Sequence, residues 1–100
     1  MSPYFNTVQL LTGQTAPFTG GWVDVGRSRE NLYSSFGTAS GSITLQYRSP
    51  FFIEQGITFY NVILSGSGYA EPVFSTSPMG EVRAISAGSG KYWCAMTQQN

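Results

Sequence analysis

The chain has 100 residues, 41% of them hydrophobic and 15% aromatic, which is enough apolar material for one buried core. Only 10% of the residues are charged, and five Lys and Arg balance five Asp and Glu. This balance excludes the basic surface typical of proteins that bind nucleic acid or anionic membranes, and so weakly charged a surface favours association with partner proteins.

The first quarter of the chain predicts short extended segments separated by turns. Tyr4–Leu11 predicts a first strand or an extended arm, and Gln14–Gly21, with its proline and paired glycines, predicts a loop. Residues 1–20 are therefore a candidate N-terminal arm and loop. Trp22–Val25 is short and β-branched, which favours a strand whose Trp22 caps one end of the core.

The clearest strand is Ser42–Arg48. Its residues Ile43, Leu45 and Tyr47 fall on one face and polar residues fall on the other, the alternation of a half-buried strand. The small residues of Gly37–Gly41 supply the φ values that a tight reversal needs. We therefore expect the strands on either side of this turn to pair antiparallel.

An apolar connection follows this strand. Pro50 ends the strand, and three large apolar residues come next, outside any alternating segment. Exposed loops seldom carry such residues, so the loop either folds back over its own core or makes an intermolecular contact. The candidate interface consists of the apolar side chains that nothing local obliges to be buried: Tyr4, Phe5, Phe51, Phe52 and Ile53.

The second half of the chain adds further strands and shows no helical periodicity. Ile57–Leu64 is apolar on both faces and needs cover on both, from a neighbouring chain or from the preceding loop. Tyr69–Ser75 contains a proline and suits a sheet edge, and Glu81–Ser86 and Lys91–Thr97 predict a hairpin. These patterns favour an all-β fold, a single β-sandwich or jelly-roll-like barrel of about eight short antiparallel strands, in one domain over residues 1–100.

The residues that usually carry chemistry are missing from the sequence. There is no histidine and only one cysteine, Cys94, and the five carboxylates lie on separate elements without the spacing of a catalytic pair. We expect no catalytic residues, no metal and no cofactor, and we expect Cys94 to be a buried, unreactive thiol. The N-terminus has no signal-peptide pattern, which favours synthesis and folding in a reducing cytoplasm.

Four aromatic residues suit two different roles. Trp22, Tyr60, Tyr69 and Trp93 could stack on sugar rings. In a sandwich of this size such residues more often serve as anchors in the core or in an interface, and we favour that interpretation.

Three segments follow one another along the chain: G-W-V-D-V at Gly21–Val25, G-T-A-S-G-S-I-T-L-Q-Y-R at Gly37–Arg48, and M-G-E-V-R-A-I-S-A-G-S-G at Met79–Gly90. Together with a closing aromatic strand, they resemble the small β-sandwich proteins that recur in the virions of tailed bacteriophages. The chain departs from that pattern after Gln46, where an insertion that includes Pro50–Ile53 replaces a polar hairpin.

The resemblance implies a phage structural protein without enzymatic activity. A single domain of this length best fits a capsid decoration (cement) protein that binds the outer surface of the shell, contacts the major capsid protein and stabilises it, commonly as a homotrimer. The expected location is the capsid surface of the virion, without a nucleic-acid or membrane partner. The alternatives are a neck, tail or fibre component and a carbohydrate-binding adhesin module.

Overall fold

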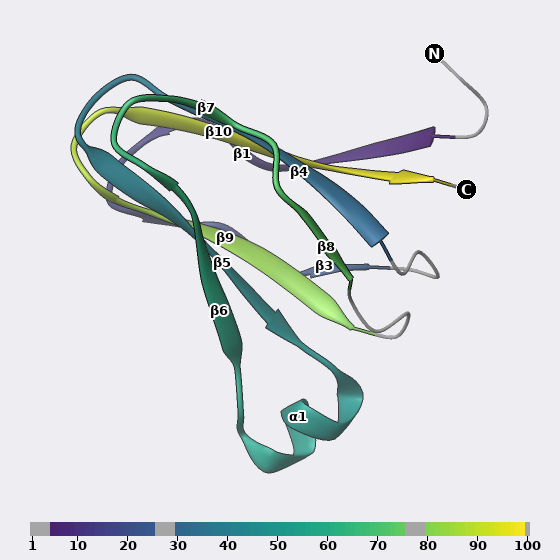
Figure 1. Cartoon of the computed structure of the whole chain (residues 1–100). Coiled ribbons are helices and arrows are strands. Elements are labelled where there is room, and N and C mark those ends of the chain that lie inside the picture. The colour runs from purple at the N-terminus through teal and green to yellow at the C-terminus, as the bar shows by residue number, and fades with distance from the viewer. Residues whose placement is uncertain (1–4, 26–29, 76–79, 100) are drawn as a thin grey trace.

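The computed structural model describes residues 5–25, 30–75 and 80–99, which form ten strands and one short helix (Figure 1). The strands are β1 (Phe5–Thr15), β2 (Phe18–Thr19), β3 (Val23–Asp24), β4 (Glu30–Gly37), β5 (Gly41–Arg48), β6 (Phe59–Ser65), β7 (Gly68–Ala70), β8 (Val73–Ser75), β9 (Glu81–Gly88) and β10 (Lys91–Gln99). The helix, α1 (Pro50–Gln55), lies between β5 and β6.

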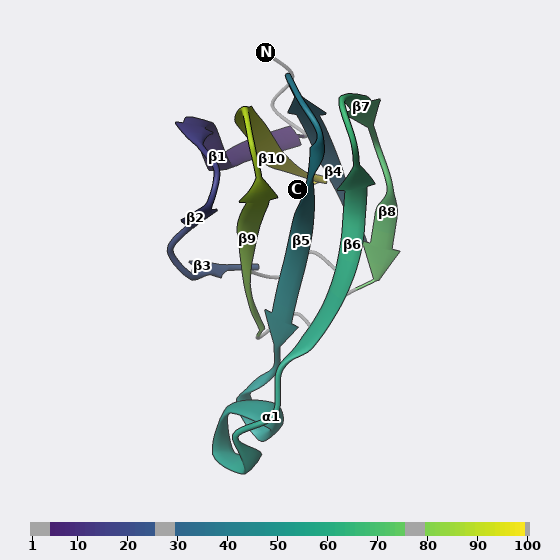
Figure 2. The ribbon, with the colours of Figure 1, turned by 90° about the vertical axis from the view of Figure 1, so that its left-hand side faces the viewer.

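The strands form two antiparallel sheets that pack as two layers (Figures 1 and 2). The first sheet has the order β1-β10-β4-β7, with β8 also paired to β4. The second sheet has the order β2-β9-β5-β6, with β3 also paired to β9. The prediction of an all-β sandwich is confirmed.

The two strand orders are those of a jelly roll. The chain is laid out as one long hairpin with α1 at its tip: β5 pairs with β6, β4 with β7 and β8, β2 and β3 with β9, and β1 with β10. Rolling this hairpin into two layers places β10 beside β4 and β9 beside β5. The hairpin tip, α1, therefore projects from one end of the sandwich (Figure 1).

Two predicted hairpins are wrong, because in each case the two strands lie in different sheets. Residues 38–40 carry the chain from β4 to β5 across the sandwich, and residues 89–90 carry it from β9 to β10. The two crossings lie side by side: the Lys91 N–H donates to Thr38 Oγ1 at 2.9 Å, and the Ser89 N–H donates to the Ser40 carbonyl at 3.1 Å. A glycine-rich turn suits a crossing between layers as well as a hairpin within one.

The glycines beside the first crossing provide space rather than an unusual φ. Neither Gly37 nor Gly41 has a positive φ, so the expectation of permissive φ values is wrong at both. Both lie against the buried Tyr92: a Cβ on Gly37 would come within 2.4 Å of its ring, and a Cβ on Gly41 within 2.2 Å of its hydroxyl. That hydroxyl donates to the Ala39 carbonyl at 2.9 Å, which ties the ring to the turn.

The core lies between the inner faces of the two sheets. Ile43 and Leu45 on β5 are buried and Tyr47 packs against them in part, which confirms the predicted inner face of this strand. The facing residues come from every long strand of both sheets. The other buried core residues are Leu10, Leu11, Ala16, Val25, Tyr33, Ile63, Leu64, Val82, Ala84, Tyr92, Cys94 and Met96.

The single cysteine lies in this core, as predicted. Cys94 is 1% exposed and shares the buried face of β10 with Tyr92 and Met96. Removal from water raises the pKa of the Cys94 thiol to about 12, and the same burial raises the pKa of Tyr33. The neutral thiol is therefore the stable form inside the protein.

The start of the chain belongs to the sandwich. β1 pairs with β10 from Phe5, opposite Gln99, to Thr15, opposite Lys91, and β2 pairs with β9. The first strand, one of the two alternatives for Tyr4–Leu11, is therefore present from Phe5, and the loop expected over Gln14–Gly21 is wrong at residues 14–15 and 18–19, which are strand. Two β-bulges in β1 shift its register against β10 and break the alternation on which the sequence interpretation depends.

Candidate functional site

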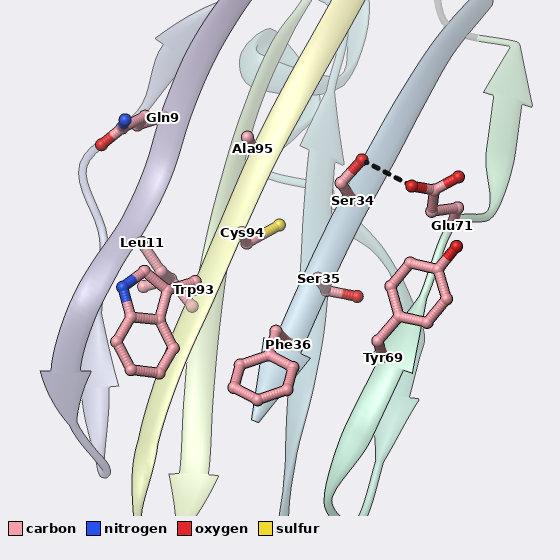
Figure 3. A pocket seen from close by; sticks show the side chains of 10 residues that line it. All are labelled: Gln9, Leu11, Ser34, Ser35, Phe36, Tyr69, Glu71, Trp93, Cys94 and Ala95. Carbon is pink, nitrogen blue, oxygen red and sulfur yellow. Dashed lines mark hydrogen bonds between the residues drawn. The ribbon is translucent and has the colours of Figure 1, made fainter. Parts of the chain in front are cut away.

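The outer face of the first sheet carries a shallow groove of about 280 Å³ (Figure 3). Three exposed aromatic side chains line it in one row, because Trp93 on β10 stands opposite Phe36 on β4, and Phe36 stands opposite Tyr69 on β7. The ring centroids of Trp93 and Phe36 are 5.7 Å apart, with 47° between the ring planes. This row is an apolar strip that crosses three neighbouring strands.

Polar groups flank the aromatic row. Ser34 Oγ donates to Glu71 Oε1 at 3.5 Å beside Tyr69, and Gln9 lies on the β1 side of the groove (Figure 3). Of the described residues that line the groove, only Glu71 is charged. The groove therefore combines stacking surfaces with hydrogen-bonding groups and carries little charge.

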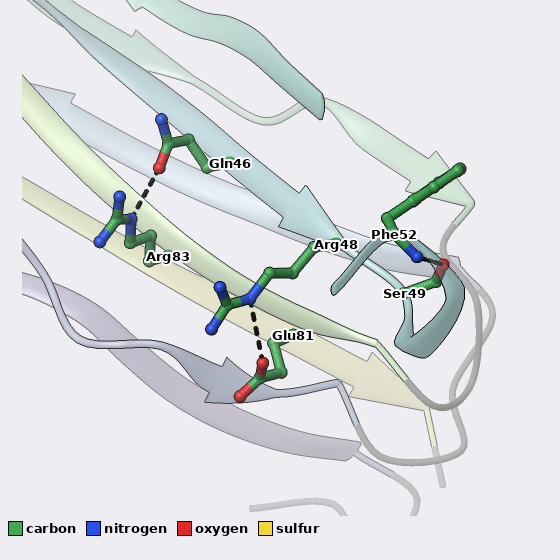
Figure 4. A network of polar contacts seen from close by, with 6 residues as sticks. All are labelled: Gln46, Arg48, Ser49, Phe52, Glu81 and Arg83. Atoms are coloured by element: carbon green, nitrogen blue, oxygen red, sulfur yellow. Dashed lines mark hydrogen bonds and ion pairs between the residues drawn. The ribbon is translucent and has the colours of Figure 1, made fainter. Parts of the chain in front are cut away.

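The outer face of the second sheet holds the other tryptophan. Trp22 does not cap the core: the guanidinium carbons of Arg48 and Arg83 lie 3.9 Å and 4.6 Å from the centre of its ring. Arg48 Nε donates to Glu81 Oε1 at 3.1 Å, and Arg83 Nε donates to Gln46 Oε1 at 2.6 Å (Figure 4). Because both arginines already have partners in the chain, this face is a structural network rather than an open ionic site.

The connection after β5 forms a helical turn that the sequence interpretation missed. Ser49 caps α1, since its side chain accepts a hydrogen bond from the Phe52 N–H at 3.3 Å (Figure 4). Pro50 occupies the first helical turn, and Gly56, at φ 67°, ends the helix. The expectation that no helix occurs is therefore wrong at this one connection, whose six residues are too few for helical periodicity to show.

α1 presents apolar side chains to the surroundings and buries none of its residues. Phe51 is 62% exposed and Ile53 is 44% exposed. Phe52 is half-buried, and its ring packs edge-on against Phe59 with centroids 4.8 Å apart. The alternative in which this segment folds back over its own sandwich is wrong, because α1 projects from the end of the two sheets (Figure 1).

The strand that follows the helix extends the same surface. Ile57, Phe59 and Tyr60 are exposed, and further along β6 Val62 is exposed as well. We call residues 50–60, from α1 to the start of β6, the apolar tip. β6 is the last strand in the order of the second sheet, so one of its edges is unpaired among the described strands. Phe52 covers part of Phe59, and otherwise the apolar side chains that the sequence predicted to need cover lie exposed among the described residues of β6.

The predicted interface residues fall into two groups in the structure. Phe51, Phe52 and Ile53 lie together on α1. Phe5 begins β1 in the opposite sheet, so the structure does not bring it to α1. Tyr4 lies outside the described residues, and the expectation for it remains a prediction.

Two parts of the surface were missed as candidate sites. Phe59 was recognised only as part of an over-apolar strand, and Tyr60 also as a possible sugar-stacking or anchoring residue. Trp93 and Tyr69 were named in the same way, but the row that they form with Phe36 was missed because it depends on which strands are neighbours. One signal could have located part of it: Phe36 and Trp93 each alternate with buried neighbours, so both must point outward.

Within residues 5–25, 30–75 and 80–99, no three His, Cys, Asp or Glu side chains come together as a group that could hold a metal ion. No helix in these residues is long and apolar enough to cross a membrane.

Comparison with known proteins gives no relative from which a function could be transferred. No protein-family model, no curated protein and no solved structure matches the chain. Function must therefore be argued from the surfaces described above.

Proposed function

We propose that this protein is a non-enzymatic structural protein of a bacteriophage virion, and specifically a capsid decoration protein. It binds the outer surface of the major capsid shell as a homo-oligomer, most simply a trimer, and stabilises the shell. The observation that carries the proposal is the apolar tip, which presents large side chains to water at one end of a rigid sandwich.

The tip is suited to protein contact because moving its exposed apolar side chains from water into an interface lowers the free energy. Burying one such side chain is worth roughly 1.5 to 3 kcal/mol when it is complete. Phe51 and Ile53 lie on the exposed surface of a capped helix, and Phe59 lies beside them on β6. Phenylalanine is among the residue types enriched in protein interfaces, and this cluster contains two.

The charge of the tip is consistent with a protein partner. Glu54 is the only charged residue among residues 50–60. A surface with so little charge does not attract a polyanion and does not repel a second protein. The contact is therefore dominated by apolar burial, offset by the cost of ordering each bound copy.

The unpaired edge of β6 supports association with further copies. An apolar edge strand exposes backbone donors and acceptors beside apolar side chains, and native proteins usually protect such edges. Val62 and Tyr60 lie along this edge, at 61% and 69% exposure. Contact with a neighbouring copy or with the shell would cover both, and three copies around one axis would close the assembly.

The resemblance to virion proteins and the jelly roll both support this function without being sufficient alone. Jelly rolls occur in viral capsid proteins and also in lectins. The architecture is therefore compatible with a virion protein and with a sugar-binding protein, and it does not distinguish between them. The apolar tip, at the Pro50–Ile53 insertion where the chain departs from the virion pattern, then favours an assembly role.

Two experiments test the proposal: the protein composition of purified virions, and binding of the purified chain to capsid shells. Mass spectrometry of purified virions, from the phage whose genome encodes this chain, should detect the protein in many copies per particle. Purified chain added to shells of the major capsid protein should bind saturably and raise the temperature at which the shells dissociate. Absence of the chain from virions, together with no binding to shells, would overturn the proposal.

A further inference from the structure

We propose that the groove on the outer face of the first sheet binds a neutral glycan, with sugar rings stacked on the aromatic row of Trp93, Phe36 and Tyr69. This inference does not depend on the shell-binding role, because the groove and the apolar tip lie on different sheets. A decoration protein with such a groove would display a glycan-binding surface on the outside of the particle.

The spacing of the aromatic row suits a linear sugar. The three side chains come from consecutive strands at matched register, Trp93 opposite Phe36 and Phe36 opposite Tyr69. Neighbouring strands lie about 4.8 Å apart, so the row extends over roughly 10 Å, enough for two linked hexose rings. The exposed fractions of Trp93, Phe36 and Tyr69 are 39%, 46% and 69%, so each offers a surface for stacking.

The indole of Trp93 is held in place before any ligand arrives. It lies against Gly13 in the second bulge of β1, where a Cβ would come within 2.8 Å of the indole Cε2. Gly13 has a φ of +88°, a conformation that other residues rarely adopt. On its other side the indole contacts Phe36. A pre-ordered aromatic side chain loses little conformational entropy when a ligand binds.

The polar groups of the groove match the chemistry of sugar hydroxyls. The Glu71 carboxylate accepts hydrogen bonds and already accepts one from Ser34, and the Gln9 amide can both donate and accept. Among the described residues, no cation lines the groove to receive an acidic sugar or a phosphate. A neutral polyol with apolar ring faces fits this set, whereas an apolar protein segment would remove the exposed carboxylate from water with only its Ser34 hydrogen bond in return.

The groove differs from the apolar tip in shape. Each surface carries one carboxylate and one amide, Glu54 and Gln55 on the tip and Glu71 and Gln9 in the groove, but the tip is a projecting helical turn, whereas the groove is a hollow that has its amide and its carboxylate at the two ends of the aromatic row. This difference is the reason for assigning a glycan to the groove and a protein to the tip.

The test is a screen of the full chain on an array of immobilised neutral oligosaccharides with matched sialylated and uronic-acid glycans. The strongest neutral oligosaccharide is then titrated in solution by tryptophan fluorescence. We expect saturable binding to neutral glycans. Trp93→Ala should abolish it, and Tyr69→Ala should weaken it about tenfold or more. Glu71→Gln should also weaken it, because the amide is a poorer acceptor.

If Trp93→Ala unfolds the chain, the Tyr69→Ala and Glu71→Gln variants still test the proposal. Tyr69 and Glu71 are both exposed, so their substitutions should leave the thermal midpoint unchanged. The matched control, Phe51→Ala with Ile53→Ala, alters the tip and should leave glycan binding intact. The proposal is overturned if the chain binds no neutral glycan, if it prefers acidic glycans, or if Tyr69→Ala dissociates an oligomer, since the occupant would then be a second copy.

Discussion

Truncation of the two most exposed side chains of α1 provides a direct test of the interface. The perturbation is Phe51→Ala combined with Ile53→Ala. Complete burial of either side chain is worth roughly 1.5 to 3 kcal/mol, and their exposed fractions are 62% and 44%. Covering what is now exposed is therefore worth about 1 to 2 kcal/mol for Phe51 and about 1 kcal/mol for Ile53. Loss of both, about 2 to 3 kcal/mol, should weaken shell binding about 30- to 150-fold.

The same substitutions should scarcely affect the isolated chain. No residue of α1 is buried, and alanine has a higher helix propensity than phenylalanine or isoleucine. The free energy of unfolding should fall by less than about 1 kcal/mol, which for a domain of this length is a shift in midpoint of less than about 8 °C. A pair of core side chains would instead cost about 2 to 5 kcal/mol each.

The assay is a titration of empty shells, built from the major capsid protein, with the purified chain, and circular-dichroism melting of each variant alongside it. Val73→Ala is the matched control, because Val73 is 58% exposed but lies on β8 in the other sheet. This control should bind shells like the unmodified chain. A folded double variant with unchanged shell affinity would show that α1 is not the contact, and a large fall in the midpoint would show that it stabilises its own sandwich.

Four further predictions concern the Cys94 thiol, its effect on stability against pH, one glycine and the oligomeric state. Cys94 should react with a thiol reagent only after denaturant is added, and fast labelling of the native protein would place it in solvent. Because burial raises its pKa from 9.0 to about 12, the corresponding stability, about 4 kcal/mol, is complete below pH 9 and is lost as the pH rises toward 12. This is measured by urea unfolding at a series of pH values. In Cys94→Ala the free energy of unfolding should fall less steeply just above pH 9, while above pH 10 it should still fall because the buried Tyr33 also ionises. A Cys94→Ala profile identical to that of the unmodified chain would contradict the burial of the Cys94 thiol. Gly41→Ala should destabilise the chain by more than 2 kcal/mol, as a Cβ there meets Tyr92 and a backbone carbonyl, whereas Gly21→Ala, with open space around it, should change urea stability by less than about 0.5 kcal/mol. Finally, the purified chain should sediment as a homo-oligomer, most simply a trimer, at micromolar concentration, and a sharp monomer boundary would count against self-association in solution.

The strands were largely predictable because side-chain alternation is a local signal. Ser42–Arg48 shows it in the sequence, and its predicted inner face is the inner face in the structure. The pairing of strands was less predictable, because it depends on contacts between distant segments. Gly37–Gly41 marks a reversal, yet whether the chain returns in the same sheet or crosses to the other is decided by packing against the turn after β9.

For the apolar tip, the sequence predicted which residues take part but not the helical turn that presents them. Phe51, Phe52 and Ile53 were recognised as unusual for a connection, and the helix on which they lie has only its caps, Ser49 and Gly56, as local signals. The aromatic row of the groove has only a partial local signal. Alternation directs Phe36 and Trp93 outward, but it does not show that their strands and the strand of Tyr69 become neighbours when the long hairpin is rolled. A surface formed by strands that are distant in the sequence can be located only when the fold is known.

The most direct test of the shell-binding role is a cryo-electron microscopy map of capsid shells saturated with the purified chain. We expect density for a jelly roll on the outer surface of the shell, in copies related by a local symmetry axis. In that density α1 and β6 should be buried against the shell or against a neighbouring copy, and the aromatic groove should face outward. Shells without additional density, or a bound jelly roll whose α1 points into solvent, would contradict the account.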